Sequence, residues 1–365
     1  MTQKDSLTSK FFYEEFKKDV EKGIKGETVF FPLAGEKLGK RVAVTKSMYF
    51  LLGGMPGSGK TAFTDTVFLL DLFDWWKKNK EHTKVKPYWV YRSMERPRKY
   101  KIAKWSCYKL WKDHNILIDV PTALGWPSKS FDLTNEVKEL LYSYEEYFEE
   151  LFEYIEFVDG AENPYGVYKK AVEVANRKGR LEQVDEYNKV YIPNDPNEVL
   201  FHITDHIGLL KPEKDLFSDK QILDKHTANM MTLRDLYGFT VIDINQFNRN
   251  IEDTYRAVKT ELTPLPSDFK GSANMFQNAD VVMALFNPYK LKAYDHMGYT
   301  VPKFVSEKGH NRLRSMTILK NSYGIDDFRI AYQFIGENGV VQELPSSDKF
   351  QQDPTLYSYF TNLTV

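Results

Sequence analysis

The sequence contains, at residues 54–61, the stretch that decides its fold: Gly54-Met55-Pro56-Gly57-Ser58-Gly59-Lys60-Thr61. It fits the pattern G-x-x-x-x-G-K-[ST] in full. The glycines let successive backbone N–H groups point inward at phosphate oxygens, and a helix starting here adds positive partial charge. Lys60 is expected to reach the β- and γ-phosphates, and the Thr61 hydroxyl is expected to ligate Mg²⁺. The stretch therefore predicts a site for a nucleoside triphosphate.

The segments on either side of this loop have the patterns of a buried strand and of a helix. Residues 47–52 (SMYFLL) form a short apolar run, and residues 61–76 follow with helical spacing. Further strand-like runs alternate with helical stretches, so the sequence predicts an α/β fold with a mostly parallel central sheet flanked by helices. The other predicted strands are 87–93, 155–158, 199–204, 240–245, 281–285 and 314–319, and the other predicted helices are 100–112, 136–156, 164–178 and 219–236.

Two local features refine this outline. Asn163 and Ser218 stand directly before two of the predicted helices, where a side-chain oxygen can cap the first turn. Residues 179–197 contain two prolines and are expected to form an irregular connection.

Composition excludes several classes of protein. The 365 residues include 50 Lys and Arg against 51 Asp and Glu, so global charge cannot hold the chain on nucleic acid. Cys107 is the only cysteine, which excludes an intramolecular disulfide and a cysteine-based zinc site. No apolar run approaches the roughly 18 residues that span a bilayer, and the charged start lacks a signal-peptide pattern. We expect a cytoplasmic protein that makes no membrane contact.

Three polar side chains stand at the ends of predicted strands, where they complete a site for phosphoryl transfer. Hydrolysis needs a carboxylate that holds magnesium and a group that activates the attacking water. Asp205 ends an apolar run and is the predicted magnesium acid; the alternative is a loop acid that caps the next turn. Glu95 is expected one strand away from the phosphate loop and is the predicted base; the alternative is a surface glutamate. Gln246 is expected to contact the γ-phosphate; the alternative is an ordinary polar strand end.

The first 26 residues have the pattern of an amphipathic helix. Phe11, Phe12, Phe16 and Val20 fall near helical spacing, with Lys and Glu between them. Two interpretations remain open: a helix packed on its own domain, or an arm that docks on a neighbouring subunit.

Taken together, these segments resemble the RecA-like ATPase domain of the DnaB-type replicative helicases, superfamily 4. The resemblance covers roughly residues 27–340 and depends on five segments in the family's order. They are 93–97 (SMERP), similar to the family's Ser-Leu-Glu-Met; 204–210 (TDHIGLL), similar to Asp-Tyr-Leu-Gln-Leu; 245–249 (NQFNR), similar to Ser-Gln-Leu-Asn-Arg; 267–282, similar to the DNA loop and following strand; and 320–324 (KNSYG), similar to Lys-Gln-Arg-Asn-Gly.

The resemblance implies a P-loop NTPase that hydrolyses ATP with Mg²⁺, assembles as a homo-hexamer with ATP at subunit interfaces, and moves along single-stranded DNA in replication. It implies that Glu95 is the catalytic base and that Lys320 reaches across to a neighbour's γ-phosphate. Ser322 stands where the family has its trans-acting arginine, which leaves three alternatives: Lys320 acts alone, hydrolysis is feeble, or an arginine substitutes, the candidates being Arg312, Arg314 and Arg329.

The resemblance also divides the chain. We expect an N-terminal helical arm over 1–26, a RecA-like ATPase domain over 27–345 and a C-terminal tail over 346–365. The family's N-terminal helical domain, which meets primase, has no counterpart here, as in stand-alone motor domains of phage-encoded helicases. A primase or a helicase loader is the expected protein partner.

A long polar stretch over 249–270 is the expected DNA contact. Its candidate phosphate-binding residues are Arg249, Arg256, Lys259 and Lys270. Long loops in compact domains are commonly functional, although the alternative is a solvated loop with ordinary charges. Single strands suit such a surface, because tracking the backbone requires no reading of base edges.

Two rival functions share this fold. One is a RecA/RadA-like recombination or repair ATPase, which would exchange strands instead of unwinding them. The other is a non-motor nucleotide-binding switch or loader, which Ser322 and the missing N-terminal domain favour.

Overall fold

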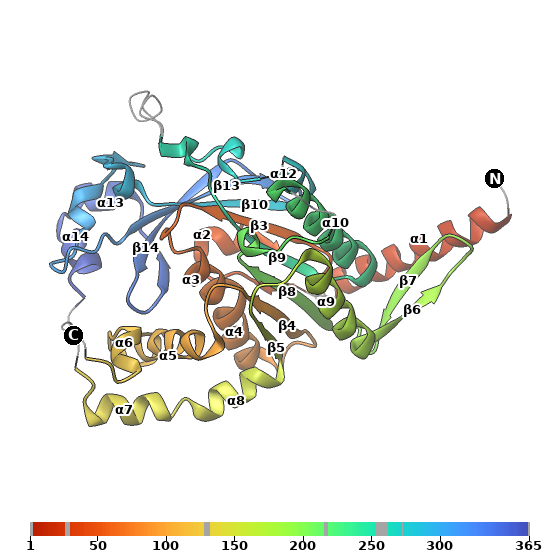
Figure 1. Ribbon diagram of the computed structural model, residues 1–365, viewed down its shortest axis with the longest axis horizontal. Coiled ribbons are helices and arrows are strands. Elements are labelled where there is room, and N and C mark those ends of the chain that lie inside the picture. The colour runs from red at the N-terminus through yellow and green to blue at the C-terminus, as the bar shows by residue number, and fades with distance from the viewer. Residues whose placement is uncertain are drawn as a thin grey trace.

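A nine-stranded sheet forms the centre of the molecule (Figure 1). The computed structural model describes residues 3–25, 30–127, 132–214, 218–252, 262–271 and 273–363. The strand order is β15-β14-β13-β10-β3-β9-β8-β4-β5; the six strands from β10 to β5 are parallel, and β13 to β15 are antiparallel. The strands are β3 Tyr49–Gly54, β4 Lys86–Ser93, β5 Ile155–Asp159, β8 Glu198–Asp205, β9 Thr240–Gln246, β10 Val281–Phe286, β13 Leu313–Asn321, β14 Phe328–Ile335 and β15 Val340–Glu343.

Helices cover both faces of this sheet, which confirms the predicted α/β class (Figure 1). On one face lie α3 Lys60–Thr64, a π-helical stretch Asp65–Leu70, α4 Asp71–Asn79, α5 Arg98–His114, α6 Val120–Ala123, α7 Asn135–Tyr142 and α8 Glu145–Glu153. On the other face lie α9 Pro164–Lys178, α10 Asp219–Tyr237 and α12 Ala273–Asn278.

The alternation of side chains along β3 explains the two layers. Phe50 and Leu52 enter the core under α3 to α5, whereas Tyr49 and Leu51 enter the core under α9 and α10. Successive side chains of a strand point to opposite faces, so a continuous apolar run serves both cores. The strand that carries the phosphate loop is therefore buried on both faces.

The two helix caps predicted from the sequence are confirmed. Three segments, 61–76, 136–156 and 179–197, differ in secondary structure from the prediction. Asn163 accepts a hydrogen bond from Gly166 N and caps α9, and Ser218 accepts one from Gln221 N and caps α10. The single helix predicted over 61–76 contains a π-helical stretch, and the one predicted over 136–156 is two helices followed by β5.

The prediction of an irregular connection over 179–197 is wrong. It contains an antiparallel hairpin of β6 Gly179–Gln183 and β7 Lys189–Pro193. Asp185 fixes its turn, because its Oδ1 accepts hydrogen bonds from the backbone N–H groups of Tyr187 and Asn188. Aspartate commonly stabilises turns in this way, but the sequence prediction was based on the two prolines of the segment and missed the turn.

Smaller elements complete the ends of the domain. The segment expected as a C-terminal tail contains two helices, and Phe350, Tyr357 and Phe360 pack there against Tyr299 and Phe304. These elements are β1 Phe31–Pro32, α2 Glu36–Gly39, β2 Ala43–Val44, β11 Asp295–His296, β12 Tyr299–Thr300, α13 Ser347–Gln352 and α14 Thr355–Thr361, with 3₁₀ turns at Ile207–Leu209, Arg249–Glu252, Pro266–Asp268, Pro288–Leu291 and Val301–Phe304.

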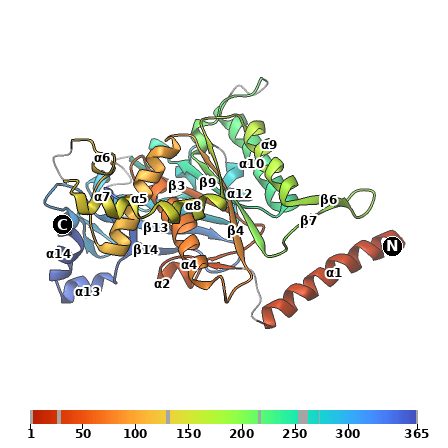
Figure 2. The ribbon, with the colours of Figure 1, turned by 90° about the horizontal axis from the view of Figure 1, so that it is seen from below.

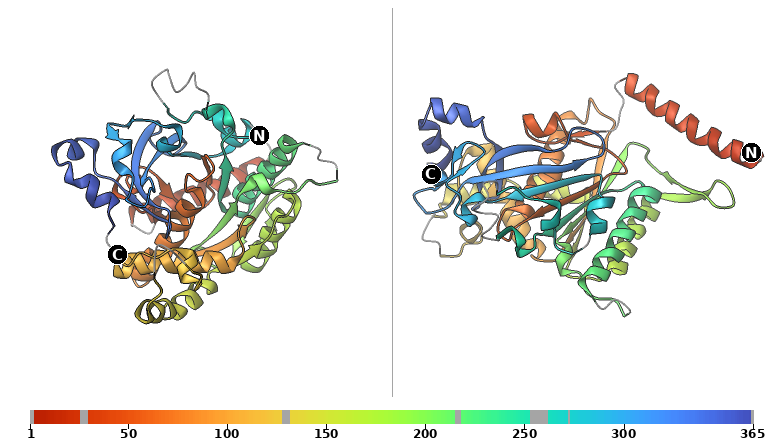
Figure 3. Two further views of the ribbon diagram at one scale, coloured as in Figure 1. Left: turned by 60° about the vertical axis from the view of Figure 1, so that its left-hand side comes forward. Right: turned by 90° about the horizontal axis from the view of Figure 1, so that it is seen from above.

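One helix stands apart from these layers. α1, Gln3–Ile24, extends away from the sheet, as does the β6–β7 hairpin (Figures 2 and 3). Phe16, Val20 and Ile24 are spaced four residues apart on α1 and are exposed. Of the helices that the structure describes, none combines the length and the apolar character needed to cross a bilayer.

Candidate nucleotide-binding site

The predicted phosphate loop connects β3 to α3, with Gly57 and Gly59 in left-handed backbone conformations. Gly59 has φ of 100°, and a Cβ atom there would lie 2.9 Å from the Phe334 ring, so a larger residue would be strained and crowded. Lys60 Nζ donates hydrogen bonds to the carbonyl oxygens of Gly54 at 2.9 Å and Met55 at 3.0 Å. The Lys60 ammonium therefore lies against the first two residues of its own loop.

Burial lowers the pKa of Lys60 to about 8, against the opposing effect of Asp205 and Glu95. A charged ammonium is costly to bury without a counter-charge. A bound phosphate would supply that charge. The loop therefore presents a buried cation, the Lys60 ammonium, which favours an anionic ligand.

The two predicted magnesium ligands are in direct contact. Thr61 Oγ1 donates a hydrogen bond to Asp205 Oδ1 at 2.9 Å. Asp205 ends β8 and is buried, and a hydroxyl and a carboxylate are the hard oxygen donors that Mg²⁺ prefers. Mg²⁺ is commonly bound by one or two carboxylates together with substrate phosphates, and this pair fits that pattern.

The second oxygen of Asp205 belongs to a buried cluster that includes Lys101, Asp65 and Tyr91. Lys101 Nζ lies 2.7 Å from Asp205 Oδ2 and 3.2 Å from Asp65 Oδ2. The Tyr91 hydroxyl donates a hydrogen bond to Asp65 Oδ1 at 2.6 Å. Burial alone would raise the pKa of Asp205, but the Lys101 ammonium outweighs it and lowers that pKa. The cluster keeps Asp205 ionised and fixes its orientation.

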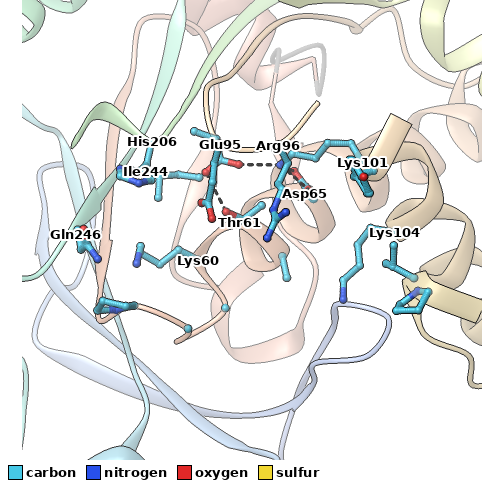
Figure 4. Close-up of a pocket in the computed structure, with 18 of the residues that line it drawn as sticks. Lys60, Thr61, Asp65, Glu95, Arg96, Lys101, Lys104, His206, Ile244 and Gln246 are labelled. Atoms are coloured by element: carbon cyan, nitrogen blue, oxygen red, sulfur yellow. Dashed lines mark hydrogen bonds and ion pairs between the residues drawn. The ribbon is translucent and has the colours of Figure 1, made fainter. Parts of the chain in front are cut away.

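One cavity of about 620 Å³ lies at the carboxyl ends of the parallel strands, and it is lined by Lys60, Thr61, Asp65, Lys101 and Asp205 among others. Figure 4 shows Lys60, Thr61 and Glu95 around its centre, with His206 and Gln246 on one side and Lys104 on the other. The cavity volume lies within the range of about 300–1,000 Å³ typical of ligand sites.

The structure corrects the expected position of Glu95 in the sheet order. Its strand β4 is separated from β3 by β8 and β9, so Glu95 does not follow the neighbouring strand. Gln246 ends the strand that neighbours the phosphate-loop strand, because it pairs with Gly54 where β9 lies beside β3. Glu95 still reaches the cavity, since it lies in the segment between β4 and α5 that borders the opening.

Lys320 does not line this cavity. It lies on β13 opposite Val282, at the far end of β10 from the phosphate loop, and its Nζ donates to Gln277 O at 2.6 Å. Two candidate substitutes are engaged within the chain: Arg312 forms two hydrogen bonds with Glu337, and Arg314 Nε donates to Ser58 O at 3.0 Å.

The third substitute, Arg329, has an exposed side chain. Its Nη1 donates to Thr263 Oγ1 at 3.3 Å. Ser322, which takes the place of the family's arginine, is exposed as well.

The predicted DNA-binding residues are described only in part. Arg256 and Lys259 lie outside the described residues, and for Arg249 only the backbone is described. Lys270 N donates to Gln246 O at 3.0 Å, and Lys270 Nζ forms an ion pair with Asp219 at 3.2 Å. The backbone of Lys270 thus lies beside the end of β9.

Sequence reasoning missed several cavity residues, chiefly Asp65, Arg96 and Lys101. Asp65 lies four residues after Thr61, and Lys101 lies six residues after Glu95. Helical spacing from the predicted residues would have brought Asp65 to the same face. For Lys101 and Arg96 no sequence signal exists beyond their nearness to Glu95.

Comparison with known proteins supports the fold. No family model matches the chain, and no curated protein matches it. Among solved structures, it is similar to one titled as a DnaB-like replicative helicase and its interactions with primase, with a TM-score of 0.57, 18% identity and 82% of this chain covered. It is similar also to a second structure, titled as an ATPase domain, with a TM-score of 0.54 and 17% identity over 82% of this chain and 86% of that one.

The chain spans 59% of the length of the DnaB-like helicase structure. At these identities the likeness establishes the fold alone. The chain therefore has the α/β fold of RecA-like ATPase domains, with a phosphate loop where a P-loop NTPase carries it.

Proposed function

We propose that this chain is an ATP-dependent DNA helicase or translocase of the DnaB-like type. The observation that carries the proposal is the convergence of Lys60, Thr61, Asp205 and Glu95 on one cavity. These side chains come from the phosphate loop and from two other strand ends. A lysine, a hydroxyl, a magnesium acid and a further carboxylate are the groups that phosphoryl transfer to water requires.

The chemical step follows from these positions. Backbone N–H groups of the phosphate loop and Lys60 hold the triphosphate, and Thr61 and Asp205 are the groups that would hold Mg²⁺. The ion would neutralise charge on the phosphate oxygens. Glu95 takes a proton from the attacking water while the water oxygen bonds to the γ-phosphorus. ADP leaves with the electrons of the broken P–O bond.

Assembly is the second part of the proposal. Lys320 lies outside the cavity of its own chain, so its proposed role at a γ-phosphate requires the cavity of a neighbour, which a homo-hexamer would provide. Arg329 is the candidate arginine whose side chain is exposed. A primase or a loader is the proposed protein partner, and the cytoplasm is the proposed location.

Coupling to single-stranded DNA is the third part. Gln246 lines the cavity and is followed directly by the segment with the candidate DNA contacts Arg249, Arg256, Lys259 and Lys270. Phe247 and Phe269 pack at a ring distance of 5.1 Å, which fastens both ends of that segment to β9. Loss of the γ-phosphate at Gln246 can therefore move the segment that holds DNA.

Lys60→Ala tests the nucleotide site. It should abolish ATP binding measured by titration calorimetry, because the loop loses the cation that faces the phosphates. Lys46→Ala is a matched control, since Lys46 is a lysine at the opposite end of β3. Full ATP affinity in Lys60→Ala, with an unchanged circular dichroism spectrum, would remove the assignment.

A non-motor nucleotide switch is the second candidate. It is favoured by Ser322 and by the engagement of Arg312 and Arg314 within the chain. Stoichiometric ATP binding without turnover that responds to single-stranded DNA would support the switch over the motor.

A further inference from the structure

Two cations from outside the nucleotide cavity hold carbonyl oxygens of the phosphate loop. Arg314, near the start of β13, donates from Nε to Ser58 O at 3.0 Å. Lys290 donates from Nζ to Pro56 O. Neither cation lines the cavity, and the phosphate-loop motif includes neither residue.

The sheet places both residues beside the loop. β10 runs parallel to β3, and its Leu285 pairs with Gly54, where the loop begins. The 3₁₀ turn that carries Lys290 follows β10 directly. β13 starts at the same end of β10 and carries Arg314. Both cations therefore reach the loop through the pairing of β10 with β3 and with β13.

Each of the two hydrogen bonds orients one N–H group of the loop. A trans peptide bond is planar, and its C=O and N–H point in opposite directions. A donor on Pro56 O therefore fixes the N–H of Gly57, and a donor on Ser58 O fixes the N–H of Gly59. Among the described residues neither N–H has an acceptor within the chain, so both are left to bind an anion.

Arg314 is itself held on several sides. Its side chain is buried, and Nη1 donates to Leu313 O at 2.7 Å and to Asn311 O at 3.2 Å. The guanidinium carbon lies 4.8 Å from the centre of the Phe334 ring. The same ring lies against Gly59 of the loop. The donor to the loop is therefore fixed before any ligand binds.

The charge on Arg314 has no counter-charge in the described part of the chain. Burial and the nearby Arg312 lower the pKa of Arg314 to about 10, so it stays charged at neutral pH, and no described carboxylate pairs with it. Arg312, by contrast, is neutralised by two hydrogen bonds to Glu337. A buried cation without a counter-charge is costly, and an anion bound in the loop would supply one.

We propose that Arg314 and Lys290 are positioning residues that orient the N–H groups of Gly57 and Gly59 for binding of the triphosphate. We name these two cations the loop brace. This inference rests on the proposed function and adds two residues that act on the ligand through the loop. A charged donor also polarises the peptide bond that it contacts, which strengthens the N–H of that peptide bond as a donor.

Inorganic tripolyphosphate tests the loop brace, because it has the phosphates of ATP without ribose or base. We would measure Mg²⁺-dependent binding of tripolyphosphate and of ATP to the full chain and its variants by titration calorimetry. Arg314→Met should weaken both ligands by the same factor, at least about tenfold, because a buried charged hydrogen bond is lost. Lys290→Gln should weaken both by about threefold, because its contact is exposed.

Lys292→Gln is the matched control. Lys292 is an exposed lysine two residues after Lys290, and it does not line the nucleotide cavity. This variant should bind both ligands as the unaltered chain does. Circular dichroism and urea unfolding verify that each variant is folded.

Two further readouts separate positioning of the loop from a purely structural role. Arg314→Lys keeps the charge and a donor, so it should recover part of the affinity that Arg314→Met loses. The effect of Lys290→Gln should shrink between about 0.05 M and about 0.5 M salt, because an exposed charge is screened, whereas the effect of Arg314→Met should persist.

The outcomes are distinguishable. Unaltered tripolyphosphate affinity in folded Arg314→Met, or no recovery in Arg314→Lys, would overturn the loop brace. If Arg314→Met does not fold, Lys290→Gln decides, and tripolyphosphate binding equal to that of Lys292→Gln would overturn it. Retained tripolyphosphate binding by Lys60→Ala would instead remove the phosphate site and with it the proposed function.

Discussion

At the scale of single residues, the orientation of Asp205 depends on a lysine that no motif contains. Lys101 lies between two buried carboxylates, Asp205 and Asp65, and its own side chain is only 4% exposed. Burial lowers the pKa of Lys101, but the two acids outweigh this and raise it, so the ammonium stays charged. One cation thus allows two acids to be buried beside the phosphate loop.

Lys101→Met should therefore destabilise the protein by about 3–5 kcal/mol, because it leaves buried carboxylates without a counter-charge. Urea unfolding followed by circular dichroism measures this. Lys99→Met is the control, since Lys99 is an exposed lysine on the same helix and should change stability by less than about 0.5 kcal/mol.

The double variant Lys101→Met with Asp65→Asn should regain part of the loss, because it removes one of the two charges. Equal stability of Lys101→Met and Lys99→Met would contradict this account of the cluster.

The difference between Asp205 and Lys101 shows what sequence can predict at this scale. The phosphate loop has a fixed spacing, and Asp205 and Gln246 end apolar runs, so their place beside the loop follows from the parallel sheet. Lys101 on α5 meets Asp65, which begins the π-helical stretch, and Asp205, which ends β8, only through tertiary packing. That contact depends on tertiary structure, which one sequence does not encode as a pattern.

At the scale of elements, α1 is a helix on which the large apolar side chains that the structure describes are exposed. Phe16, Val20 and Ile24 lie on one face of this helix, which extends away from the sheet (Figures 2 and 3). Most helical stability in proteins comes from packing of an apolar face. We expect this face to pack on a neighbouring subunit, which keeps the arm interpretation and makes it testable.

The variant Phe16→Ser with Val20→Ser should shift the assembly toward smaller species. Light scattering in the presence of Mg²⁺ and a non-hydrolysable ATP analogue measures the mass. Lys17→Ser with Glu21→Ser changes the same helix at charged positions and should leave the mass unchanged. An unaltered mass distribution in the apolar double variant would contradict docking by this helix.

Element boundaries were predictable where periodicity was clear. The helix predicted at 164–178 has the observed limits, because Asn163 and Pro164 mark its start. The antiparallel strands β14 and β15 were missed, and the β6–β7 hairpin was predicted as irregular. Hairpin pairing depends on turn geometry and on partners along the sheet, which apolar runs alone do not reveal.

At the scale of the whole molecule, the sheet order brings the parts of the site together. β9 lies between β3 and β8, so Gln246 stands between the phosphate loop and Asp205 at one edge of the sheet. The same strand leads into the segment proposed to hold DNA. In the proposed function, a change at the γ-phosphate therefore has a short path, through Gln246, to that segment.

The central claim is that this cavity hydrolyses ATP and that single-stranded DNA controls the rate. The most direct measurement is steady-state ATP hydrolysis, with and without a single-stranded oligonucleotide, by the unaltered chain and by Glu95→Gln. We predict that the oligonucleotide stimulates the unaltered chain, and that Glu95→Gln binds ATP but loses at least about 100-fold in turnover. Turnover by Glu95→Gln at the unaltered rate, or a rate that ignores DNA, would contradict the account.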